Sequence, residues 1–133
     1  MTNTQTYPSA GSTDIRKGQL WTGRILWAIS VPFMLLDAGL HIAKPGPVLE
    51  AFEKLQIPVS TSVGLGVLEL ILVALYVIPR TAVLGAVLLT GYLGGAMAIH
   101  MRVGDPLWFP VLVGALLWGS LWCRDARVRS LFA

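Results

Sequence analysis

The chain has 133 residues, of which 55% are hydrophobic and only 13% are charged, and its mean hydropathy is +0.70. Soluble domains carry about 25% charged residues, so this composition argues against an ordinary water-soluble domain. The formal charge of +3 and the pI near 9.4 do not indicate a nucleic-acid-binding protein, because the basic residues lie at the ends of apolar blocks and form no continuous patch. Since Cys123 is the only cysteine, no internal disulfide can form.

Residues 1–19 are polar and rich in Thr, Ser, Gly and Gln, which predicts a disordered tail. The basic pair Arg16 and Lys17 precedes an apolar run that is too long for the core of a signal peptide, and no small-residue cleavage site follows it. We therefore expect the first helix to remain in the mature protein. Residues 20–133 are expected to form a single transmembrane domain.

Four apolar blocks follow the tail, and each has the length of roughly 17–25 residues that crosses a bilayer as an α-helix. A soluble helical bundle would need a polar face on each helix, and these blocks have almost none. The sequence therefore predicts an all-α membrane protein, a four-transmembrane-helix bundle with the lipid bilayer as its surroundings. The expected helices are about 20–42, 61–78, 81–100 and 107–123.

The connection between the first two blocks has apolar side chains at helical spacing, with charged side chains on the opposite face. Such a pattern is typical of a helix that lies in the membrane interface. We expect a short amphipathic helix here, bounded by Pro47 and Pro58 because proline interrupts helices. Its apolar positions are Val48, Leu49, Phe52 and Leu55, and its charged positions are Glu50, Glu53 and Lys54.

The Lys and Arg residues beside the blocks predict the orientation. Seven of them lie at the N-terminal flank, in the second loop and in the C-terminal tail, whereas Lys44, Lys54 and Arg102 lie on the other side. Basic residues accumulate on the cytoplasmic side of membrane proteins. Both termini are therefore expected to face the cytoplasm.

Ionisable side chains inside the apolar blocks each need an explanation, because a charge near the bilayer centre costs at least about 2.5–3.5 kcal/mol. With antiparallel helices, the ionisable groups of the first three blocks all fall in the outer leaflet, except Arg24, which can extend to the inner interface. The sequence therefore predicts a polar pocket that opens outward. Its residues are Asp37, His41, Glu69, Tyr92, His100 and Arg102.

Each of these residues also has a purely structural explanation. Asp37 and His41 lie four apart and can pair with each other or with Lys44, while His100 and Arg102 lie at a helix end that tolerates charge. Glu69 lies deepest and belongs either to a site or to a buried structural pair. The sequence shows no catalytic motif, and no spacing that predicts a metal site.

Gly91 and Gly95 form a GxxxG pair in the third block. Small residues at this spacing let membrane helices approach closely. The pair is expected to serve packing within the chain, with homodimerisation as the alternative, and the oligomeric state stays open.

The run from Gly91 to Pro106, GYLGGAMAIHMRVGDP, resembles the signature of the DoxX-like family. Glu69 after Gly66, and Asp37 in the first block, resemble other marked positions of that family. The resemblance extends over roughly residues 24–132 and implies a small four-helix protein of the bacterial inner membrane, within the short, generic branch of the family.

The resemblance implies an accessory or assembly subunit of a membrane complex, such as a quinone-linked redox complex with a redox protein partner. The chain is then not expected to catalyse a reaction on its own. The alternative is a binder of quinone or a similar amphipathic molecule, in which Asp37, Glu69 and His100 supply hydrogen bonds or proton exchange and Tyr92 an aromatic wall.

Overall fold

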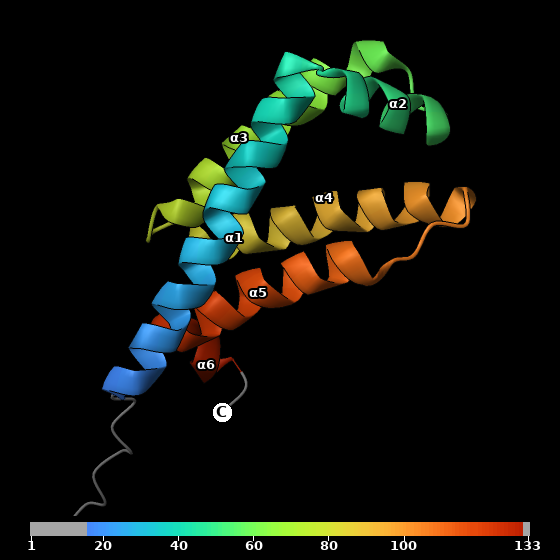
Figure 1. Ribbon diagram of the computed structural model, residues 1–133. Helices are drawn as coiled ribbons and strands as arrows, with labels where there is room; N and C mark the ends of the chain where they lie inside the picture. The colour runs from blue at the N-terminus through green and yellow to red at the C-terminus, as the bar shows by residue number, and fades with distance from the viewer. Residues whose placement is uncertain (1–15, 132–133) are drawn as a thin grey trace, which may run out of the picture.

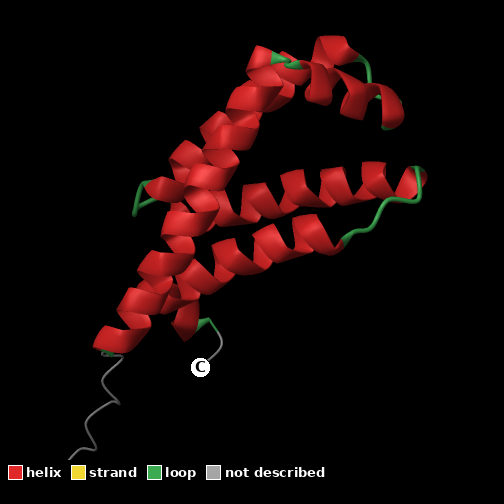
Figure 2. Ribbon diagram, in the orientation of Figure 1, coloured by secondary structure: helices red, strands yellow, loops and turns green. Residues whose placement is uncertain are grey.

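The computed structural model describes residues 16–131, and all regular secondary structure among them is helical (Figures 1 and 2). Most of the predicted tail, residues 1–15, lies outside the described residues, and its last three residues already form the start of the first helix. The elements, in chain order, are α1 Lys17–Ala43, α2 Gly46–Lys54, the 3₁₀ turn η1 Val59–Thr61, α3 Ser62–Val77, α4 Ala82–Arg102, α5 Trp108–Arg124 and α6 Ala126–Ser130.

Three segments are long and apolar enough to cross a membrane: α1, the segment Val59–Val77 that contains η1 and α3, and α4. The prediction of spanning helices is therefore confirmed for these three. The fourth predicted block forms α5, which has 17 residues and lies at the short end of the range for a span. The short helix α6 had not been predicted, since a five-residue stretch leaves no recognisable period in the sequence.

The amphipathic helix between the first two blocks forms where it was predicted, as α2. It follows the extended residue Pro45, and Pro47 lies in its first turn, where a missing N–H costs no hydrogen bond. Phe52 is buried, while Glu50 and Glu53 are exposed. Phe52 therefore packs against the protein, whereas Val48 and Leu55 are only partly buried and Leu49 is exposed.

Helix α1 is the longest element, and helices α3 and α5 pack against it (Figure 1). Helix α3 runs antiparallel to the C-terminal half of α1, and α5 packs against its N-terminal half. Helix α4 packs against both α3 and α5. The α4–α5 pair diverges from the α1–α3 pair toward the end of the molecule that carries α2 (Figure 1).

The buried core lies where these pairs of helices meet. The hydroxyl of Tyr76 on α3 donates a hydrogen bond to the main-chain oxygen of Leu117 on α5, at 2.7 Å. Apolar side chains such as Met34, Leu89 and Leu121 belong to the same core as Tyr76 and Leu117 and are almost fully buried. The outer faces of the long helices are also apolar, as lipid requires of a surface it solvates.

Polar contacts connect separate elements of the structure at both ends of the molecule. At the end with the N-terminus of α1, Arg129 on α6 donates to Gln19, and Arg127 donates to the main-chain oxygen of Pro79 in the α3–α4 turn. At the other end, Lys54 of α2 forms an ion pair of 2.7 Å with Asp105 in the α4–α5 loop. The second contact joins the two diverging pairs of helices.

Three glycines bring helices into close contact. A Cβ built at Gly23 would lie 2.8 Å from Cys123 Cβ on α5, and one at Gly66 would lie 2.7 Å from the main-chain oxygen of Ala38 on α1. A Cβ at Gly85 would lie 2.6 Å from Tyr76 Cα, at the tight turn between α3 and α4. Glycine at these positions therefore sets the distance between helices.

We predict that Gly85→Ala destabilises the fold, because the added methyl group would overlap the main chain of Tyr76, which cannot move aside. Overpacking of this kind costs about 1–3 kcal/mol. Gly94→Ala is the matched control on the same helix, since a Cβ there meets open space and alanine favours helix by about 1 kcal/mol. Thermal unfolding in detergent should give Gly85→Ala the lower Tm of the two, and an equal or higher Tm would contradict the packing.

Candidate functional site

A cavity of about 500 Å³ lies between the two diverging pairs of helices and beneath α2. It is lined by residues of α1, α2, α3, α4 and α5. Most of them are apolar, including Phe33, Met34, Leu93, Phe109 and Val113. The ionisable residues in its lining are Asp37, His41, Glu69, Tyr92 and His100.

Two of these residues come from one face of α1, because Asp37 and His41 are four residues apart. Their side chains lie close together, with 3.5 Å between His41 Nδ1 and Asp37 Oδ2. The same nitrogen lies 3.0 Å from the main-chain oxygen of Asp37. The pairing that the sequence allowed is therefore present, and it faces the cavity.

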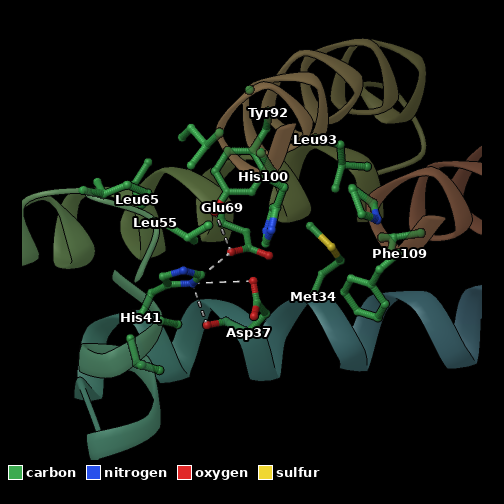
Figure 3. A pocket seen from close by; sticks show the side chains of 18 of the residues that line it. Met34, Asp37, His41, Leu55, Leu65, Glu69, Tyr92, Leu93, His100 and Phe109 are labelled. Atoms are coloured by element: carbon green, nitrogen blue, oxygen red, sulfur yellow. Dashed lines mark hydrogen bonds and ion pairs between the residues drawn. The ribbon is translucent and has the colours of Figure 1, made fainter. Parts of the chain in front are cut away.

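Helix α3 adds Glu69 to this pair because Gly66, one turn earlier, lets α3 approach α1 closely. The hydroxyl of Ser62 fixes the same contact, since it donates a hydrogen bond of 2.6 Å to the main-chain oxygen of His41. As a result, Glu69 Oε2 lies 3.7 Å from His41 Nδ1 (Figure 3). The Glu69 side chain has no exposed surface.

Helix α4 contributes Tyr92, whose hydroxyl donates a hydrogen bond of 3.0 Å to Glu69 Oε2 (Figure 3). The other carboxylate oxygen, Glu69 Oε1, is buried and has no hydrogen-bond partner among the described residues. Buried polar atoms are nearly always satisfied in folded proteins. An unsatisfied carboxylate oxygen beside a cavity is therefore the feature most in need of a ligand.

The polar cluster, defined as Asp37, His41, Glu69 and Tyr92, contains two carboxyl groups and one imidazole. No lysine or arginine of the described chain lines the cavity. Two ionised carboxylates in apolar surroundings are costly unless positive charge compensates them. The cluster is therefore suited to a partner that donates hydrogen bonds or carries positive charge.

His100 lines the cavity but does not join the cluster. Its Nδ1 lies 3.4 Å from Asp105 Oδ2, and Asp105 also accepts the hydrogen bond from Lys54. These contacts, first that of Lys54 and then that of His100, hold the pKa of Asp105 below its ordinary value. Arg102 is exposed at the end of α4 and lies outside the cavity lining.

Gly91 and Gly95 line the cavity instead of joining helices. A Cβ built at either residue would meet no atom of another described helix within 4 Å. The packing expected within the chain is therefore not formed at these two positions, and the close approaches occur at Gly23, Gly66 and Gly85. The absence of side chains at Gly91 and Gly95 enlarges the cavity.

Aromatic residues that the sequence analysis did not connect with the site form part of its walls. Phe33 and Phe109 meet edge to face with ring centroids 5.3 Å apart, and Phe52 on α2 packs against the His41 ring at 5.6 Å. The amphipathic spacing of α2 indicated that Phe52 would be buried. It gave no information about which helix Phe52 would contact.

Comparison with known proteins connects this architecture with a family. The model of the DoxX-like family matches residues 25–120, which include the cluster and most of the cavity lining. No curated protein and no solved structure matches the chain. The predicted resemblance is confirmed: the chain belongs to the DoxX-like family and is a membrane protein with several spanning helices.

Proposed function

We propose that this protein binds one small amphipathic molecule in the cavity between the α1–α3 and α4–α5 pairs. The observation that carries the proposal is an apolar cavity of about 500 Å³ with a hydrogen-bonding cluster in its wall. Small-molecule sites have volumes of roughly 300–1,000 Å³, mostly apolar walls and a few polar groups that orient the ligand. The polar head group would contact the cluster, and the apolar part would lie against Phe33, Phe109 and Val113.

A quinone is the ligand class that the chemistry of the lining favours. Both redox forms of a quinone find partners in this lining. The hydroxyl groups of the quinol can donate hydrogen bonds to the carboxyl groups of Asp37 and Glu69, and the carbonyl oxygens of the quinone can accept hydrogen bonds from the imidazoles of His41 and His100. Both imidazoles line the cavity, and both come from helices that also place aromatic side chains there. Aromatic rings favour edge and offset contacts with a flat ring system.

The membrane arrangement we propose has four spans, α5 being the fourth, with both termini in the cytoplasm of a bacterial inner membrane. Seven Lys and Arg residues near the termini and in the α3–α4 turn, against three on the other side, support this orientation. The contacts of Arg127 with Pro79 and of Lys54 with Asp105 lie at opposite ends of the molecule, as the orientation requires. The polar cluster then lies in the outer leaflet.

The role of accessory or assembly subunit, which the sequence favoured, stays a prediction. It is compatible with ligand binding, because a subunit that holds a quinone can supply it to a redox partner. Purification in mild detergent, followed by mass spectrometry of proteins and of small molecules together, would find a protein partner, a retained ligand or both.

We predict that Gly95→Leu lowers the affinity for a short-chain ubiquinone analogue by at least about tenfold, equivalent to 1.4 kcal/mol. The leucine side chain would project into the cavity, since Gly95 lines it and a Cβ built there meets open space. Gly94→Leu is the matched control, because Gly94 is equally open but does not line the cavity. Affinity is measured by calorimetry in detergent. Binding by Gly95→Leu equal to that of the wild type would contradict the proposal.

The orientation is tested by cysteine labelling in a Cys123→Ser background. Cysteines replace Glu53 on α2 and Ser130 on α6, both of which are exposed. A membrane-impermeant maleimide added to intact cells freed of the outer membrane should label the cysteine at position 53 and leave that at 130 unlabelled. Labelling of both positions, or of position 130 alone, would refute the arrangement.

A further inference from the structure

We propose that Asp37, His41 and Glu69 together bind one divalent transition-metal ion of the Zn²⁺ class. These residues are acceptable metal ligands by type, but they come from two helices and show no ligand spacing that would predict the site from the sequence. The three side chains offer one imidazole nitrogen and two carboxylate groups, and their ligand atoms all lie within 4.8 Å of one another. This inference concerns the cluster itself and does not depend on an amphipathic ligand.

The distances between the ligand atoms fit a tetrahedral ion. Zn²⁺ binds nitrogen and oxygen ligands at about 2.0–2.2 Å, so two ligands of one tetrahedron lie about 3.3–3.6 Å apart. His41 Nδ1 lies 3.5 Å from Asp37 Oδ2 and 3.7 Å from Glu69 Oε2. Binding therefore needs only small adjustments of these side chains, together with loss of the contact between His41 Nδ1 and the main-chain oxygen of Asp37.

The buried oxygen of Glu69 is a second and independent indication of a ligand. Glu69 has no exposed surface, and its Oε1 has no hydrogen-bond partner among the described residues. Figure 3 shows the carboxylates of Asp37 and Glu69 turned toward one another beside the His41 ring. A cation bound by both oxygens of the Glu69 carboxylate would contact Oε2, which lies near His41, and would also satisfy the unpartnered Oε1.

The charge of the cluster also favours a divalent ion. As metal ligands the carboxyl groups of Asp37 and Glu69 are deprotonated, so they would bring two negative charges to the ion, and no lysine or arginine of the described chain lines the cavity to compensate them. A mixed set of imidazole and carboxylate ligands suits Zn²⁺ and its neighbours, whereas Mg²⁺ and Ca²⁺ prefer oxygen ligands alone.

Neighbouring groups hold the ligands in place, as they do in known metal sites. Tyr92 donates a hydrogen bond to Glu69 Oε2, and Ser62 holds the main chain of His41. The cluster faces the cavity, which leaves room for water or a head-group oxygen as the fourth ligand. Three protein ligands and one open position are typical of zinc sites that also bind a small molecule.

The test uses the full chain without a histidine tag, purified in detergent and stripped with a chelator. Titration with Zn²⁺ should give one bound ion per chain by elemental analysis. Asp37→Asn and Glu69→Gln should each lower the affinity at least about tenfold, the smallest effect expected even from loss of an outer-shell partner. Asp105→Asn makes the same type of change outside both the cluster and the cavity lining, and it should leave the affinity unchanged.

The proposal is overturned if the stripped chain binds no Zn²⁺, or if the Asp37 and Glu69 variants bind it as tightly as the wild type. Replacing Zn²⁺ by Co²⁺ tests the site in the wild-type chain. This measurement therefore does not require that any substituted chain folds correctly. Intense visible absorption from a four-coordinate ion supports the site, and the weak spectrum of the hydrated ion refutes it. Because no quinone is added in these titrations, their failure would leave the quinone prediction standing, and failure of quinone binding would likewise leave the metal site standing.

Discussion

The side chain of Glu69 has no exposed surface, although it belongs to a helix long and apolar enough to cross a membrane. Neither lipid nor the apolar core can stabilise a carboxyl group, so the neighbouring helices must supply polar partners. Helix α1 provides His41 and α4 provides Tyr92, while Oε1 is left without a partner among the described residues. The position of this one carboxyl group therefore determines how three helices must face one another.

The cavity also results from the need to place polar partners around the Glu69 carboxyl group. Gly66 and Ser62 hold α3 against the C-terminal half of α1, and the α4–α5 pair diverges from them, so the space between the pairs stays open beside Glu69. Helix α2 covers that space with Phe52, and Lys54 joins it to the α4–α5 loop. A fold that only had to bury apolar surface would have closed this space with larger side chains than glycine at positions 91 and 95.

Much of the architecture could be predicted from the sequence, because the length of an apolar block and the period of an amphipathic one are local properties. Depth and topology predicted that Asp37, His41 and Glu69 lie in the same leaflet, and they left open whether the three side chains meet. Which residues meet depends on the rotation of each helix about its axis, and a nearly uniform apolar helix does not encode that rotation in its pattern. For that reason Arg102, one of the predicted pocket residues, lies outside the cavity lining, and the ion pair between Lys54 and Asp105 was not predicted.

The glycines also show that a sequence pattern does not predict which helices come into contact. Gly91 and Gly95 have the spacing of a packing motif, yet the close helix contacts occur at single glycines such as Gly66 and Gly85. A glycine allows a close approach, but only the partner helix determines whether the approach occurs. Membership of the DoxX-like family identifies the chain as a membrane protein with several spanning helices, but it does not identify a ligand. The ligand has to be inferred from the chemistry of the cavity.

The contact between Glu69 and Tyr92 tests the convergence of helices most directly, by a double-mutant cycle on the free energy of unfolding. Glu69→Gln and Tyr92→Phe should be non-additive by at least about 0.5 kcal/mol, as expected for residues in contact. Tyr76→Phe removes a hydrogen bond on the same helix as Glu69 but to a different partner, so it should be additive with Glu69→Gln. Additivity of the Glu69 and Tyr92 changes would contradict the account, because the cluster would then not exist as described.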